Sequence, residues 1–117
     1  MYLVHVAIHL ELRRKEKVQG FLDRFSAKLG CELSNVRVER YFKEPKHFRT
    51  TFDVPIAATD KERGVYQTLV VARTLESGHW LVNGPHEFEP IHFECFFDSS
   101  GDQPLKWGHV ELLTVEE

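Results

Sequence analysis

Three His-x-Glu triplets occur in a chain of 117 residues that contains seven histidines. They are His9-Leu10-Glu11, His92-Phe93-Glu94 and His109-Val110-Glu111. In a β-strand, residues two apart share a face and lie roughly 6.5–7 Å from each other, so triplets on neighbouring strands would bring imidazoles and carboxylates together. Such a set of nitrogen and oxygen ligands could hold a divalent metal ion. The alternative is a solvated polar face whose cross-strand pairs contribute roughly a few tenths of a kcal/mol each. Because neither a Cys-x-x-Cys nor a His-Glu-x-x-His motif is present, we predict no metal ligand and no cofactor.

The same histidines could take part in acid–base catalysis, for instance His92 with His109 or His86. An enzyme of that kind acting on nucleic acid needs cations near the phosphate, and Lys106 is the only Lys or Arg after Arg73. No Gly-x-Ser-x-Gly motif, phosphate-binding glycine loop or nucleotide fingerprint occurs. The sequence therefore favours a protein without chemistry of its own, and no catalytic residue is predicted.

Negative charge and aromatic rings are concentrated in the last third of the chain. Through Arg63 there are thirteen Lys and Arg against nine Asp and Glu, whereas from Gly64 onward there are two against nine, for a net charge of −3. An acidic surface with bulky aromatic anchors is typical of electrostatically steered protein recognition. The predicted partner-binding residues are Trp80, His86, Glu87, Glu89, His92, Glu94, Trp107, His109 and Glu111. The competing interpretation is that the aromatic residues form the core and that the carboxylates keep the protein soluble.

These features predict a small protein-binding domain with a basic protein partner, such as a toxin or nuclease domain. Bacterial immunity proteins, which cover a toxin's active site or contact face, are one class with this character: small, often acidic and without catalytic motifs. Carboxylates such as Glu87, Glu89, Glu94 and Glu111 would replace phosphate in a basic cleft of the toxin. The alternative is a dimeric ligand-binding or regulatory domain that packs through its sheet, and a small enzyme using His and Glu ranks last. Nucleic acid is not an expected partner, because the chain has no net positive field.

Strand and helix signals alternate along the chain. Residues 3–12 alternate apolar and polar side chains, as expected for a strand with one buried face. The further predicted elements are helices over 13–29 and 60–76 and strands over 36–42, 48–54, 79–82, 91–97 and 107–113. Thr59 and Glu62 have the spacing of a capping box at the start of the second helix.

This order predicts an α+β, ferredoxin-like (split βαβ) antiparallel sheet with two helices on one face, plus a C-terminal β-hairpin. With both helices on one side, the other face of the sheet is open, and it either stays wet or binds something.

Length and composition fit one domain spanning residues 1–117. No apolar run approaches the ~20 residues that cross a bilayer, and the first residues lack the basic region and cleavage site of a signal peptide. Cys31 and Cys95 are too few for a disulfide scaffold, although a single bridge between them is compatible with the sequence. A cytoplasmic protein, monomeric or homodimeric and without membrane contact, is expected.

Overall fold

The computed structural model describes residues 2–41, 47–76, 78–85, 92–99, 101 and 103–115. Within them lie two helices and six strands. The elements are β1 (Tyr2–Glu11), α1 (Lys15–Leu29), β2 (Ser34–Arg40), β3 (His47–Pro55), α2 (Lys61–Leu75), β4 (Leu81–Asn83), β5 (Phe93–Asp98) and β6 (Leu105–Thr114). The α+β class predicted from the sequence is confirmed.

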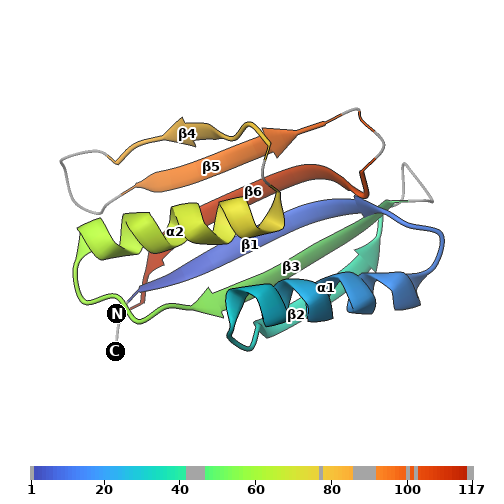
Figure 1. The fold of residues 1–117 in the computed structure, drawn as a ribbon, viewed down its shortest axis with the longest axis horizontal. Helices are drawn as coiled ribbons and strands as arrows, with labels where there is room; N and C mark the ends of the chain where they lie inside the picture. The colour runs from blue at the N-terminus through green and yellow to red at the C-terminus, as the bar shows by residue number, and fades with distance from the viewer. Residues whose placement is uncertain are drawn as a thin grey trace.

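All six strands form one antiparallel sheet in the order β2-β3-β1-β6-β5-β4. The central strand β1 lies between β3 and β6, and β2 and β4 are the two edges. Figure 1 shows α1 and α2 on the same side of the sheet. The predicted C-terminal hairpin is therefore part of the main sheet, since β6 pairs with β1 and β5 pairs with β6. Strand β4 pairs with β5 at the far edge.

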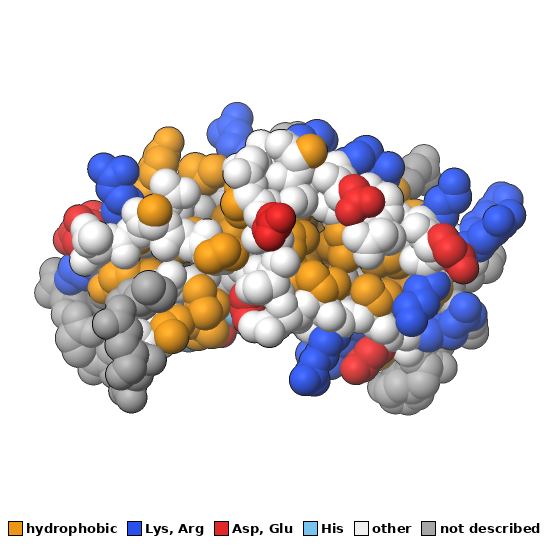
Figure 2. Space-filling view, turned by 90° about the horizontal axis from the view of Figure 1, so that it is seen from below, with side chains coloured by type: hydrophobic (Ala, Val, Ile, Leu, Met, Phe, Trp, Pro, Cys, Tyr) orange, Lys and Arg blue, Asp and Glu red, His pale blue; other side chains and the backbone are white. Residues whose placement is uncertain are grey.

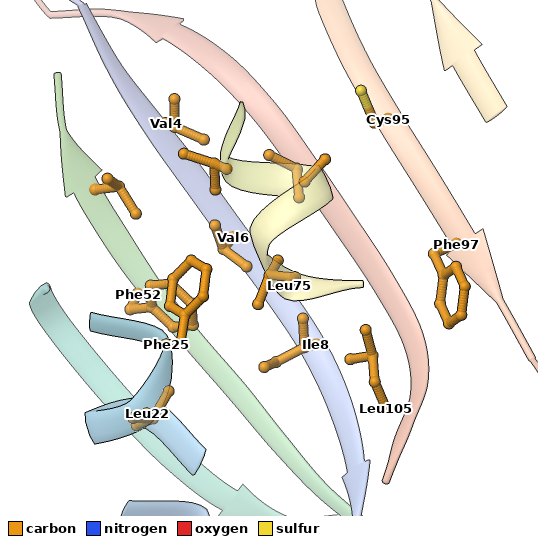
Figure 3. Close-up of a cluster of buried hydrophobic side chains, with 14 of the residues drawn as sticks. Val4, Val6, Ile8, Leu22, Phe25, Phe52, Leu75, Cys95, Phe97 and Leu105 are labelled. Atoms are coloured by element: carbon orange, nitrogen blue, oxygen red, sulfur yellow. The ribbon is translucent and has the colours of Figure 1, made fainter. Parts of the chain in front are cut away.

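The core lies between the helices and the sheet. The alternation of apolar and polar residues along β1 explains which side chains of this strand enter it. Val4, Val6, Ile8 and Leu10 are fully buried, as the sequence pattern predicts for one face of a strand. Figure 3 shows side chains of β1 meeting Leu22 and Phe25 of α1, Phe52 of β3 and Leu75 of α2. This packing fixes which face of every strand is turned toward the helices.

Both helices have definite ends. Gly30 follows α1 with φ 79° and ψ 25°, the left-handed conformation that glycine adopts most readily, as predicted. Helix α2 is capped by Asp60, whose side chain accepts a hydrogen bond from the backbone N–H of Arg63 at 2.8 Å. The predicted cap at Thr59 is therefore wrong by one residue. A carboxylate also interacts more favourably than a hydroxyl with the positive end of the helix dipole.

Neither α1 nor α2, the two helices of the described residues, has the length and hydrophobicity that a bilayer crossing requires. The side of the molecule where α1 and β2 lie is rich in Lys and Arg, with hydrophobic side chains gathered between the charged ones (Figure 2). A groove of about 240 Å³ lies on α1 and β2, where its apolar lining comes from Leu22, Leu33 and Val36.

Candidate functional site

The face of the sheet away from the helices carries most of the histidines and aromatic residues discussed above. We call it the open face. The residues that alternate with the core positions on the four inner strands define it. They are His5, Ala7, His9 and Glu11 of β1, His47, Arg49, Thr51 and Asp53 of β3, Glu94, Phe96 and Asp98 of β5, and Trp107, His109 and Glu111 of β6.

Glu94 is the centre of a His/Glu cluster on the open face. Its side chain lies between two imidazoles: Nε2 of His109 is 2.9 Å from Oε1, and Nε2 of His92 contacts Oε2. The side-chain amide of Asn83 on β4 donates a third hydrogen bond to Oε2 at 3.2 Å. Glu94 is only 8% exposed, so these contacts replace most of its water.

Electrostatics keep Glu94 ionised. Burial alone would raise the pKa of its carboxyl group, but hydrogen bonds from His109 and Asn83 and the charges of His92 and His109 hold that pKa below the ordinary value. A carboxylate of this kind accepts hydrogen bonds or binds a cation, and it is a poor general acid near neutral pH.

Glu111 completes the cluster. It lies directly opposite Glu94 in the register of β5 and β6. One ligand atom from each of Glu94, His109 and Glu111 can be chosen so that all three lie within 4.8 Å of one another. Two of the predicted His-x-Glu triplets therefore converge, as the strand geometry allowed.

The third triplet lies elsewhere on the open face. Glu11 is 3.5 Å from Nε2 of His47 and 3.6 Å from Nζ of Lys106. Glu11 therefore interacts with one residue of β3 and one of β6, and it is not part of the Glu94 cluster.

A continuous row of aromatic rings crosses the open face from one side of the sheet to the other. His9 is the link, with ring centroids 5.0 Å from Tyr41 and 5.2 Å from Trp107. Trp107 is followed by His109 at 6.3 Å, and His109 stacks on Phe96 at 4.7 Å. We call these five residues the aromatic row. Burial, then the charges of Arg49 and His47, lower the pKa of His9, which favours a neutral ring between its neighbours.

An irregularity at the start of β6 puts Leu105 and Trp107 on different faces of the sheet. Trp107 pairs with His9, while Leu105 pairs with the next residue of β1, Leu10, so that the register shifts by one residue. This β-bulge lets Leu105 enter the core at 2% exposure while Trp107, two residues later, lies on the open face. Simple alternation would have put both on the same face.

Five of the nine predicted partner-binding residues lie together on the side of the open face formed by β5 and β6. They are His92, Glu94, Trp107, His109 and Glu111. His86, Glu87 and Glu89 fall outside the described residues.

Trp80 lies on the opposite side of the sheet. Its ring packs against Phe97 at 5.4 Å and lies over Gly108, and its indole N–H donates to the carbonyl of Glu76 at 2.9 Å. The structure therefore places Trp80 against the core, where it is partly buried, and not on the open face.

Tyr41 and His9 were not among the predicted site residues, although both belong to the aromatic row. Tyr41 follows β2 directly and His9 lies in β1, so they are far from Trp107 in sequence. The only available signal was their alternation with core positions, which does not reveal which strands become neighbours.

Both cysteines are free, so no bridge joins them. Cys95 points into the core and is fully buried. Burial and then the negative charge of Glu94 raise the pKa of its thiol to about 11, which leaves it a poor nucleophile.

Comparison of the chain with protein-family models, with characterised proteins and with solved structures found no match.

Proposed function

We propose that this chain is a non-catalytic protein-binding domain that docks a basic protein partner on its open face. The aromatic row carries the proposal: a line of rings on a sheet face that neither α1 nor α2 covers is a set of anchors for a partner. Tyr and Trp dominate the binding energy of protein interfaces because they bury large rigid areas at low entropic cost. Such anchors work best where neighbouring groups exclude water, and the side chains of the open face are well placed to do so.

Charge supports a basic partner. Glu94 and Glu111 lie beside His109 and Trp107, and among the described residues neither carboxylate forms an ion pair with a lysine or arginine. Two carboxylates next to a ring that a partner buries would attract cationic side chains and speed their approach.

More specifically, we propose that the chain is a bacterial immunity- or antitoxin-type protein that acts in the cytoplasm against a basic toxin or nuclease domain. The fold suits that role. We infer a ferredoxin-like sheet in which β6 takes the place beside β1 and the β4–β5 pair extends the edge.

Calorimetry of the chain with candidate basic toxin domains, chosen from reading frames adjacent to its own, tests the proposal. Trp107→Ala should weaken binding by about 30-fold or more, because a buried aromatic anchor contributes roughly 2 kcal/mol or more. Tyr66→Ala is the matched control, since Tyr66 is an aromatic residue of α2, 62% exposed and away from the open face. The proposal fails if Tyr66→Ala weakens binding as much as Trp107→Ala does. It also fails if the affinity does not change between low and high salt.

A homodimer packed through two open faces is the second candidate, and the distribution of charge favours it. Arg37 and Arg49 stand on the side formed by β2 and β3, where Glu39 lies opposite Arg49, while Glu94 and Glu111 stand on the side formed by β5 and β6. A two-fold axis parallel to the strands would place each side against its opposite in the second copy. Light scattering over a concentration series separates the two candidates: a chain that stays monomeric rejects the homodimer.

A further inference from the structure

We propose that the Glu94 cluster is a binding site for a divalent transition-metal ion such as Zn²⁺, with ligands from His109, Glu94, Glu111 and His92. This inference does not rest on the proposed function, because it concerns the isolated chain and needs no partner.

The distances between donor atoms in the Glu94 cluster are compatible with one shared metal ion. Ligand atoms bound to one ion at about 2.0–2.2 Å lie roughly 3–3.5 Å apart when they are adjacent in its coordination shell. Nε2 of His109 and Oε1 of Glu94 are 2.9 Å apart, close to that spacing. The chosen atom of Glu111 lies within 4.8 Å of both, so rotation of one side chain brings it into the shell. His92 reaches the other oxygen of Glu94.

Charge is the second argument. Carboxylates directly opposite each other on neighbouring strands repel and usually destabilise the pair. Lys106 is the only Lys or Arg of β5 and β6, and its ammonium group is directed to Glu11 and to the carbonyl of Gly101. A small dication between Glu94 and Glu111 would remove the repulsion.

The donor set selects the class of metal. Imidazole nitrogen with carboxylate oxygen suits zinc, iron, cobalt and nickel, whereas calcium and magnesium prefer oxygen ligands alone. Glu94 also has the setting of a metal ligand, because it is 8% exposed and Asn83 orients it from β4. Since the ion would neutralise both carboxylates, the metal-loaded and metal-free chains would present different charges on the open face.

Titration of tag-free, chelator-treated protein with Co²⁺ and Zn²⁺ tests the site. We expect one ion per chain with a Kd of about 1 µM or lower. Bound Co²⁺ should show visible absorption bands that Zn²⁺ abolishes. Mg²⁺ and Ca²⁺ at the same concentrations should not compete.

Substitution of the proposed ligands tests whether the ion binds at the Glu94 cluster. His109→Ala and Glu111→Gln should each weaken Zn²⁺ binding at least tenfold, because each removes one ligand. Glu111 is only half-buried, so its variant keeps the test valid if His109→Ala fails to fold. His79→Ala is the control, since His79 is exposed and outside the cluster. The proposal is overturned if wild type binds less than half an equivalent, if Ca²⁺ competes, or if the control loses as much affinity as the ligand variants.

Discussion

Glu94 of β5 and Glu111 of β6 lie directly opposite each other on the open face of the sheet. Like charges in this position usually destabilise a strand pair. Here Glu94 is stabilised by His109 at 2.9 Å and by Asn83 at 3.2 Å, while Glu111 forms no ion pair with a Lys or Arg of the described residues. The pair therefore carries a structural cost, and substitutions can separate that cost from the metal binding that we propose.

The effect of Glu111→Gln on the free energy of unfolding should change sign when metal is added. In chelator, the variant should be as stable as wild type or about 0.5 kcal/mol more stable, because the repulsion from Glu94 is gone. With excess Zn²⁺ it should be the less stable protein, because it gains less from the bound ion. Urea denaturation under both conditions measures the two differences. Glu32→Gln, at an exposed position, is the control. An effect of Glu111→Gln that is identical with and without Zn²⁺ contradicts the expectation.

Thr50→Val should stabilise the protein by about 1 kcal/mol. Thr50 is fully buried in β3, and its hydroxyl has no hydrogen-bond partner among the described residues. Valine has nearly the same shape and removes an unsatisfied polar atom. Thr68 offers the matched comparison, since it is also fully buried but donates to the carbonyl of Gly64 at 2.8 Å. Chemical denaturation should show a higher free energy of unfolding for Thr50→Val and no increase for Thr68→Val. A lower free energy of unfolding for Thr50→Val would show that the Thr50 hydroxyl is hydrogen-bonded.

Gly108→Val should destabilise the protein by about 1–3 kcal/mol, because it overpacks the core. A Cβ atom at Gly108 would lie 3.1 Å from the Trp80 ring, so the indole must move away from Phe97 and from the Glu76 carbonyl. Thermal unfolding and the near-ultraviolet circular dichroism of the tryptophans measure both effects. Gly20→Ala in α1 should instead stabilise the protein by up to about 1 kcal/mol, because alanine favours a helix more than glycine does. Only the end of the Arg24 side chain lies near a Cβ atom at this position, so the methyl group fits. An unchanged spectrum in Gly108→Val would contradict the packing of Trp80.

Asp53→Asn should reduce stability near neutral pH and lose this effect in acid. Burial alone would raise the pKa of Asp53, but hydrogen bonds from Asn35 and His5, each 2.7 Å long, and the charge of His5 hold it below its ordinary 3.8. A depressed pKa means that the ionised group stabilises the folded state above its unfolded pKa. The contribution is lost as the pH falls from there through the folded pKa.

Urea denaturation at about pH 6 and about pH 2.5 measures this change. The difference between wild type and Asp53→Asn should be about 1 kcal/mol at the higher pH and smaller at the lower. A double-mutant cycle with His5→Ala isolates the part that belongs to the His5–Asp53 pair. The interpretation is wrong if the difference grows as the pH falls.

Thiol reagents should distinguish the two cysteines. Cys95 is fully buried, whereas Cys31 is partly exposed near the end of α1. In the folded protein, an aromatic disulfide reagent should modify Cys31 first, and Cys95 should react only after denaturant is added. Cys31→Ser provides the control, because it should leave a folded protein that is nearly inert to the reagent. Rapid loss of the remaining thiol in that variant would mean that the core around Cys95 opens readily.

The sequence alone determined the local features of this protein. Alternation in residues 3–12 predicted β1 and its buried face, and Gly30 predicted the end of α1. The spacing of His109 and Glu111 placed both on one face of β6, and the spacing of His92 and Glu94 left them in contact although His92 lies just before β5. These inferences succeed because the periods of strands and helices depend on neighbouring residues.

Only the tertiary structure decided which strands lie side by side. It placed β6 beside β1, set Glu94 against Glu111 and Trp107 against His9, and turned Leu105 into the core through a bulge. It also packed Trp80 against the core side of the sheet, although the sequence analysis assigned this residue to the partner-binding surface. Register depends on burying one face of the four inner strands at once, and a shift of one residue reverses every side chain of a strand. That constraint is long-range, so local spacing does not contain it.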